Sequence, residues 1–182
     1  EAAGLQPGRW YSYRFHFAGA TSPIGRTRTA PAPGAMPAKF SFAFASCQHY
    51  EQGYYAAHRH MAAEDLDLVL FLGDYIYEVA YGRDKVRQHD APTPKTLDEY
   101  RRRYALYKSD RDLQASHAAC PWAVTWDDHE VSNDYANDRS ETLTPRDQFP
   151  SQRIGGHHVS TSATCSEDEM PGNAHRLLHF TT

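Results

Sequence analysis

A run of residues from position 66 to position 72, apolar except for Asp67, constrains the fold of this chain more than any other feature of its sequence. Such a run is typical of a strand that is buried on both faces of a sheet. Residues 40–46 predict a strand before it, and residues 122–126, after Pro121, predict a third strand beyond it.

Two helices are predicted to connect these strands. Residues 51–64 form the first, with Tyr54, Ala57 and Met61 on one face. Thr96 begins the second, and Glu99 three residues later completes a capping box. The apolar face of this second helix would consist of Leu97, Tyr100, Tyr104 and Tyr107. The order strand, helix, strand, helix, strand predicts an α/β domain with a largely parallel core sheet.

The N-terminal segment has a different pattern, in which aromatic and polar residues alternate. Residues 7–17 predict a turn followed by a strand, and residues 26–29 predict a second strand after a turn near Gly19. This hairpin would be the last two strands of a β-sandwich whose other strands are missing. Prolines between positions 31 and 37 then predict a linker.

The C-terminal segment lacks the features of a packed domain. Residues after 149 are rich in Ser, Thr and His without an apolar period, so no secondary structure is predicted there. One hypothesis is that this tail is an out-of-frame translation. We therefore expect three parts: β-sandwich strands of fibronectin-III-like type at 1–33, an α/β part at 38–149, and an unstructured or non-native tail at 150–182.

Composition limits the class of protein and its partners. The chain has 182 residues, of which 40% are hydrophobic and 23% charged, as is usual for a globular protein. A net charge of -4 without a basic tract gives no nucleic-acid-binding signature, and the longest apolar run is too short to span a membrane. Oligomeric state cannot be read from the sequence.

The cysteines and the N-terminus bear on the compartment. Cys47, Cys120 and Cys165 form no disulfide framework and no zinc pattern, although a Cys120–Cys165 disulfide in an oxidising compartment stays open. The sequence begins with Glu1 and shows no signal peptide, so we expect it to derive from a longer precursor.

Polar side chains that can bind metal follow each predicted core strand. Cys47 follows the first strand, Asp74 and Tyr77 follow the second, and Asp127, Asp128 and His129 follow the third. In open α/β sheets, ligands bind outside the carboxyl ends of the strands. The sequence therefore predicts that three distant segments deliver side chains to one site.

The residue types at this site indicate its chemistry. Carboxylates favour hard cations, a thiolate adds a softer donor, and a phenolate suits ferric iron. A bound metal polarises a phosphoryl oxygen and lowers the pKa of bound water, and a carboxylate such as Asp74 can bridge two metals. His129 could donate a hydrogen bond to phosphate or to the leaving oxygen.

Three motifs carry a family resemblance. They are Phe-Ala-Ser-Cys-Gln at 44–48, Gly-Asp-Tyr-Ile-Tyr-Glu at 73–78 and Trp-Asp-Asp-His-Glu-Val at 126–131. In this order and spacing they resemble the signatures of PhoD-like metallophosphatases, in the calcineurin-like metallophosphoesterase superfamily. Residues 5–31 are similar to the end of that family's N-terminal β-sandwich domain.

This resemblance implies a fold and an activity. The fold would be an incomplete calcineurin-like sheet and helix domain, with 38–149 as the first half of the catalytic domain. The activity would be alkaline phosphatase or phosphodiesterase, hydrolysing phosphate esters with ferric iron and calcium. The protein would be secreted or periplasmic, exported by a twin-arginine signal that this chain lacks.

The resemblance also implies roles for individual residues. Cys47, Asp74 and Tyr77 would bind iron, with Asp74 bridging to calcium and also counted as catalytic. Asp128 would bind calcium, and His129 would be catalytic through contact with the substrate phosphate. Asn133 is a weaker candidate, either as a metal ligand or as the neighbour of one.

Several other residues receive a structural interpretation. The family takes further His and Asp ligands from a second half, and Gly156-His157-His158 is a poor candidate for them. Arg101, Arg102 and Arg103 could steer phosphate, but we expect them on a solvated helix face. His58 and His60 are predicted to lie at the surface, away from the metal site.

Other functions remain open. The chain could be a truncated, inactive fragment or an extracellular binding module. A purple acid type of binuclear phosphatase also uses phenolate-bound iron, but Asn is expected there in place of Asp128. No Gly-x-x-x-x-Gly-Lys segment occurs, so the sequence does not support nucleotide binding.

Overall fold

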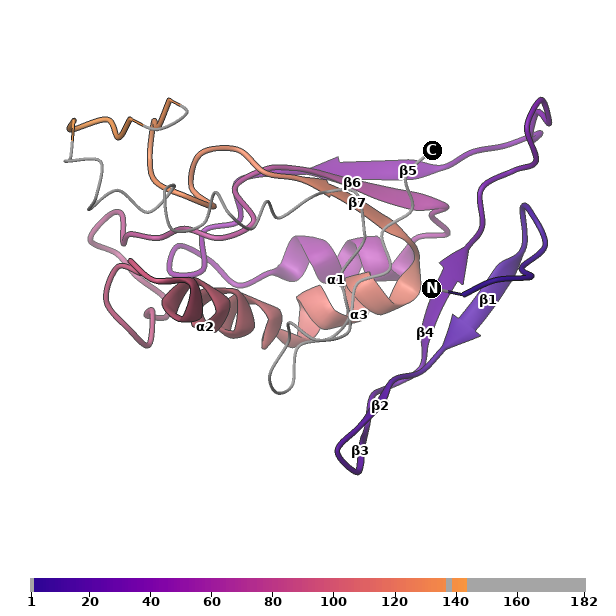
Figure 1. Cartoon of the computed structure of the whole chain (residues 1–182), viewed down its shortest axis with the longest axis horizontal. Coiled ribbons are helices and arrows are strands. Elements are labelled where there is room, and N and C mark those ends of the chain that lie inside the picture. Colours follow the sequence, from indigo (N-terminus) through magenta and orange to yellow (C-terminus); the bar gives the residue numbers. More distant parts are fainter. Residues whose placement is uncertain (1, 137–138, 144–182) are drawn as a thin grey trace.

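A computed structural model of the chain has a three-stranded parallel sheet at its centre (Figure 1). The structure describes residues 2–136 and 139–143. The sheet order is β5 (Phe42–Ala45), β6 (Leu68–Leu72) and β7 (Trp122–Thr125), and both pairs are parallel. The predicted α/β fold with a parallel core is therefore confirmed.

Three helices connect these strands and lie to one side of the sheet (Figure 1). Helix α1 (Ala56–Ala63) joins β5 to β6, while α2 (Leu97–Lys108) and α3 (Arg111–Ala119) lie between β6 and β7. Sequence analysis missed α3, which begins where the Asp110 carboxylate accepts hydrogen bonds from the amides of Asp112 and Leu113.

The predicted capping box at the start of α2 is confirmed. Thr96 Oγ1 accepts from the Glu99 amide at 3.3 Å, and Glu99 Oε2 accepts from the Thr96 amide at 2.8 Å. Arg103, however, is only 2% exposed, so its predicted place on a solvated face is wrong. It follows Tyr100 by three positions and therefore shares the buried face of the helix.

Helix α1 is shorter than predicted and buries a different side chain. Residues before Ala56 form turns, Tyr54 is exposed, and His58 is buried. The prediction of His58 at the surface is wrong. Its Nε2 lies 2.7 Å from Gln48 Oε1, and its ring packs on Phe71 and Trp122, so a buried position satisfies both its polar and its flat apolar character. His60, as predicted, is exposed.

The core lies between the helices and one face of the sheet. Val69 and Phe71 of β6 are fully buried there. On the opposite face, Phe42, Phe44 and Leu72 are 52%, 68% and 51% exposed. The prediction that this run is buried on both faces is wrong for the described part of the chain, because the helices all pack on the same side.

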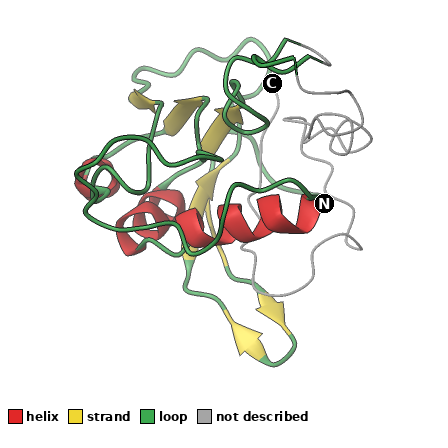
Figure 2. Ribbon diagram, turned by 90° about the vertical axis from the view of Figure 1, so that its left-hand side faces the viewer, coloured by secondary structure: helices red, strands yellow, loops and turns green. Residues whose placement is uncertain are grey.

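The N-terminal segment forms the predicted antiparallel hairpin, but in two pieces. Strand β1 (Trp10–Tyr13) pairs with β4 (Gly25–Arg28), and β2 (His16–Phe17) pairs with β3 (Ala20–Thr21) around Gly19. The β2–β3 end extends away from the helices (Figures 1 and 2). The assignment of this hairpin to a β-sandwich stays a prediction, as do the domain boundaries.

The hairpin is attached to the α/β part by specific contacts. Arg28 forms an ion pair with Asp67, and Tyr13 Oη donates to the His117 carbonyl at 3.5 Å. Trp10 packs at the edge of the core. These contacts connect the hairpin to the β6 entry and to α3.

Some predictions fall on residues that the structure does not describe. These are the tail at 150–182, the Gly156-His157-His158 segment and the Cys165 partner of the Cys120–Cys165 disulfide. Cys120 itself is described and is a buried free thiol. Within residues 2–136 and 139–143, no helix combines the length and apolar character needed to cross a membrane.

Candidate metal centre

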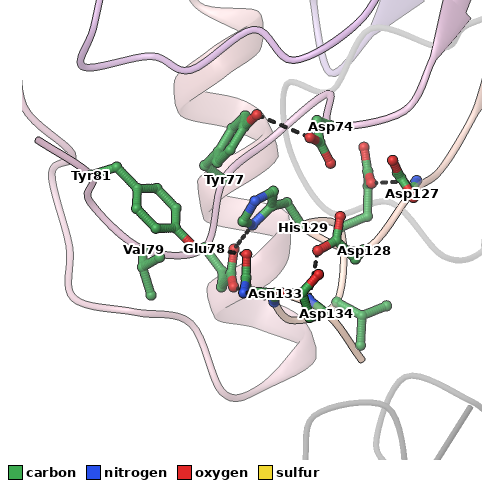
Figure 3. A network of polar contacts seen from close by, with 12 residues as sticks. Asp74, Tyr77, Glu78, Val79, Tyr81, Asp127, Asp128, His129, Asn133 and Asp134 are labelled. Carbon is green, nitrogen blue, oxygen red and sulfur yellow. Dashed lines mark hydrogen bonds and ion pairs between the residues drawn. The ribbon is translucent and has the colours of Figure 1, made fainter. Parts of the chain in front are cut away.

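The loops that leave the three parallel strands meet at one end of the sheet, as expected for parallel strands. Asp74 follows β6, while Asp128 and His129 follow β7, and Figure 3 shows them facing one another. One ligand atom from each of these three residues lies within 4.8 Å of the other two. The predicted convergence of these three side chains is therefore present in the structure.

Cys47 lies in the neighbouring loop, which main-chain hydrogen bonds hold against the loop of Asp74. The Cys47 amide donates to the Gly73 carbonyl at 3.2 Å, and the Gln48 amide donates to the Asp74 carbonyl at 3.1 Å. Cys47 and Asp74 both adopt the left-handed conformation, with φ of 58° and 54°. Non-glycine residues in this conformation concentrate at functional sites, because surrounding contacts must offset the strain.

Asp74 has one carboxylate oxygen that the described residues leave unsatisfied. Tyr77 Oη donates to Asp74 Oδ2 at 3.0 Å, whereas buried Asp74 Oδ1 has no hydrogen-bond partner among the described residues. A buried, unpaired carboxylate oxygen is costly unless a cation or a donor satisfies it. This atom fits a metal ligand.

Tyr77 lies between the thiol and the carboxylate of the two loops. Burial raises the pKa of its phenol, and the hydrogen bond and charge of Asp74 raise that pKa further, as does the neighbouring Cys47 thiol. Without a cation, the phenol therefore stays protonated. A bound cation reverses this preference, because it stabilises the phenolate. Cys47, Asp74 and Tyr77 therefore supply the donor atoms of a metal site, and a cation would balance their negative charge.

His129 is oriented by a buried carboxylate. Its Nδ1 lies 2.8 Å from Glu78 Oε2, and both residues are buried (Figure 3). Since the carboxylate can only accept, Nδ1 carries a proton and Nε2 is the atom free to face the cluster. The ring also packs on Tyr77, with centroids 4.1 Å apart.

Family comparisons agree with this geometry. The sequence profile described as PhoD-like phosphatase matches residues 42–156, and the profile of the PhoD-like phosphatase N-terminal domain matches residues 1–31. The chain belongs to the PhoD-like phosphatase family. The first match contains every residue of the candidate site, and the second contains the N-terminal hairpin.

Two relatives of this PhoD-like chain show how much of the family protein it spans. Alkaline phosphatase D of Bacillus subtilis (strain 168) is 56% identical over 166 residues, which are 87% of this chain and 28% of that protein. A solved structure titled "Structure of PhoD" is 49% identical, with a TM-score of 0.76, over 85% of this chain and 32% of the other. The chain thus spans about a third or less of these relatives.

Two buried glutamates of the PhoD-like motifs have roles that sequence analysis missed. Glu78 accepts from His129 and, through Oε1, from the Asn133 amide at 2.7 Å. Glu130 accepts from the amides of Tyr75 and Asp127 and so joins the loops after β6 and β7. Both lie inside the quoted six-residue motifs, which was the available signal, but all of their partners except Asp127 are more than fifty positions away in sequence.

Negative charge accumulates around this centre. Burial raises the pKa of Asp127, and the charges of Asp74 and Asp128 raise it further. Burial likewise raises the pKa of Glu130, with Asp74 adding to the effect. Crowded carboxylates repel one another, so a cation would stabilise the arrangement.

Asn133 lies beside the cluster in a hydrogen-bonded acidic loop. Its Oδ1 accepts from Tyr81 Oη at 3.1 Å, and its Nδ2 donates to Asp134 and Glu141 at 3.1 and 2.9 Å. Asp128 Oδ2 accepts from the Asp134 amide at 2.6 Å. In this arrangement Asn133 supports the loop that carries Asp128, and its role as a ligand stays a prediction.

Proposed function

We propose that this chain contributes the first part of the active site of a metal-dependent phosphoric ester hydrolase, an alkaline phosphatase or phosphodiesterase. One observation carries the proposal: Asp74, Asp128 and His129 place ligand atoms within 4.8 Å of one another in a chain that is 56% identical to an alkaline phosphatase. The family match favours this type over the purple acid type.

The proposed metals are ferric iron and calcium. Cys47, Asp74 and Tyr77 would hold iron, since a thiolate, a carboxylate and a phenolate suit that ion. Asp74 would also contact calcium together with Asp128, because oxygen donors suit a hard cation. The unpaired Asp74 Oδ1 and the hydrogen-bonded Tyr77 phenol support this set.

When bound, such metals polarise the phosphoryl oxygen and supply hydroxide from water near neutral pH. The residues of the chain then orient the ester. Glu78 holds His129 by Nδ1 and so fixes the orientation of the ring, which lets Nε2, when it carries a proton, donate to a phosphate oxygen or to the leaving oxygen. His129 would thereby stabilise charge that develops on oxygen during the displacement.

Two further expectations belong to this proposal. We infer a phosphate ester as the partner of the site and a secreted or periplasmic location reached by a twin-arginine signal. The negative charge of the chain and its lack of a basic tract are compatible with a small ester substrate.

The test uses metal analysis and chromogenic phosphate mono- and diesters. We expect the protein to bind iron and calcium. We expect Asp74→Asn to lower metal affinity and turnover by about a hundredfold or more, since loss of a residue that only orients a metal ligand already costs about 10–100-fold. Asp98→Asn, at a side chain 85% exposed on α2, is the matched control and should change neither.

A longer version of the family protein separates the remaining alternatives. If this chain neither binds metal nor turns over ester, but a version extended through the rest of the family domain does both, the chain is an inactive fragment. If the extended version also fails, the proposed activity is wrong. Metal binding without turnover in both versions would indicate a binding module.

A further inference from the structure

Arg103 holds two distant stretches of main chain together from the buried side of α2. Its guanidinium group donates through Nη1 to the carbonyls of Tyr77 and Glu78 at 2.7 and 2.9 Å. Nη2 donates to the carbonyls of Ala91 and Pro92, each at 2.9 Å. Four main-chain acceptors around one side chain are an unusually complete use of the guanidinium fork.

These bonds close the base of a long loop. The chain leaves the candidate site after Glu78 and returns to α2 after Pro92, and the two branches of the guanidinium group hold one end each. A lysine at position 103 would keep the charge but has a single nitrogen, which cannot reach both pairs of carbonyls in this planar geometry.

The two residues after β6 that Arg103 holds, Tyr77 and Glu78, contact other residues of the candidate metal centre. Tyr77 donates to Asp74, and Glu78 receives His129 Nδ1 through its side chain. Arg103 thus fixes the main chain of two residues whose side chains orient Asp74 and His129, without touching either itself. If position 103 only had to pack between the buried Tyr100 and Tyr107, an apolar side chain would be sufficient there.

We propose that Arg103 is a positioning residue for the metal centre, which it organises through the main chain of Tyr77 and Glu78. This inference rests on the proposed function, because the centre is taken to bind cations. It goes beyond the ligand set by assigning a role to a residue of α2, a helix that lies outside all three motifs.

The experiment compares Arg103→Lys with Arg102→Lys in the full chain. The two variants make the same chemical change on adjacent positions of α2, one buried and one exposed. Two properties are measured: the protonated nitrogen of the His129 ring, from long-range proton–nitrogen NMR spectra of the metal-free protein, and the affinity for Zn²⁺ as a diamagnetic probe, by calorimetry. Circular dichroism shows that each variant is folded.

We expect the wild-type protein and Arg102→Lys to carry the ring proton on Nδ1 and to bind Zn²⁺ equally. We expect Arg103→Lys to show a shift of that proton toward Nε2, and a loss of Zn²⁺ affinity of about 10–100-fold, as is typical for residues that orient metal ligands. A folded Arg103→Lys protein with the wild-type proton position and affinity would overturn the inference.

Failure of the proposed function gives a different result. If the wild-type chain does not bind Zn²⁺, the cation site is absent from this chain, yet the effect of Arg103→Lys on the His129 proton still decides the positioning role. If Arg103→Lys does not fold, the wild-type protein is measured instead. Because coupling is reciprocal, Zn²⁺ must then slow the exchange of the Arg103 guanidinium protons. Unchanged exchange would contradict the inference.

Discussion

Asp74 combines three features that a purely structural residue rarely has together. It is buried, its φ of 54° lies in the left-handed region, and one of its carboxylate oxygens lacks a hydrogen-bond partner among the described residues. Each feature costs free energy in the folded protein. A cation bound at Asp74 would offset the cost of the unpaired carboxylate oxygen. A role in metal binding therefore explains why the protein keeps a residue with these features.

The neighbouring glycine makes this loop possible. Gly73 has φ of 99°, and a Cβ built there would lie 2.5 Å from Asp127 Cβ and 2.8 Å from the Asp127 amide nitrogen. We expect Gly73→Ala to lower the free energy of unfolding by about 3 kcal/mol, because the loops of Asp74 and Asp127 would be pushed apart. Chemical denaturation measures this change.

Gly34→Ala is the control for that substitution. Gly34 also has a positive φ, of 79°, but a Cβ there would meet no described atom within 4 Å. Its cost should be that of the backbone conformation alone, about 1 kcal/mol. Equal losses in the two variants would show that the close approach to Asp127 does not matter.

Sequence reasoning found the residues whose position follows from topology. Asp74, Asp128 and His129 come directly after strands of a parallel sheet, so the strand pattern alone predicted that they meet. Glu78 and Arg103 could not be found in this way. Their roles depend on which distant main-chain or side-chain groups they meet, and hydrophobic periodicity contains no information about such polar partners.

The elements show the same division. The capping box fixed the start of α2 from two residues, because both of its hydrogen bonds are local. The start of α1 was misplaced, since the apolar side chains before Ala56 fit a helical period although that segment turns instead. The error also rotated the expected buried face, which placed His58 on the wrong side.

The burial of His58 predicts a dependence of stability on pH. Burial lowers the pKa of this imidazole below its ordinary value of 6.5, so the native state keeps it neutral while the unfolded chain takes up a proton. The free energy of unfolding should therefore fall as the pH drops from 6.5 toward the folded-state pKa. One such proton contributes at most about 1.4 kcal/mol per pH unit.

Substitutions on α1 isolate this effect from the other buried histidines, of which His89 has its pKa lowered to about 4 by burial and by Arg103. We expect His58→Gln, which can still donate to Gln48, to reduce the slope of unfolding free energy against pH below 6.5. His60→Gln, at an exposed position of the same helix, should keep the wild-type slope. A wild-type slope in His58→Gln would contradict the assignment.

The start of α2 offers a second test at this scale. Thr96→Ala removes the side-chain acceptor of the capping box and should lower the free energy of unfolding by about 1 kcal/mol. Thr93→Ala, at an exposed position in the preceding loop, should have little effect. Thermal and chemical unfolding measure the stability of both variants. If Thr96→Ala were as stable as Thr93→Ala, the cap would not support the helix that carries Arg103.

At the scale of the whole molecule, the two sides of the sheet differ sharply. All the helices that connect the strands lie on one side of the sheet (Figure 1). Val69 and Phe71 are buried, whereas Phe42, Phe44 and Leu72 are exposed on the opposite face. Parallel sheets occur almost exclusively with both faces covered. The apolar run predicted the strand itself correctly, but the described part of the chain covers only one of its two faces.

The exposed side therefore should behave as a surface in this chain and as a core in a longer family protein. Phe44→Ser should change the free energy of unfolding of this chain by no more than about 1 kcal/mol, because the ring is 68% exposed. Phe71→Ser, at a fully buried position of the neighbouring strand, should cost about 3–5 kcal/mol. In a protein extended through the rest of the PhoD-like domain, we expect Phe44→Ser to become as costly as Phe71→Ser, since the added residues would then cover the ring. Chemical denaturation of both variants in both lengths measures the four values, and a Phe44→Ser cost that stays small in the extended protein would show that this face is left open.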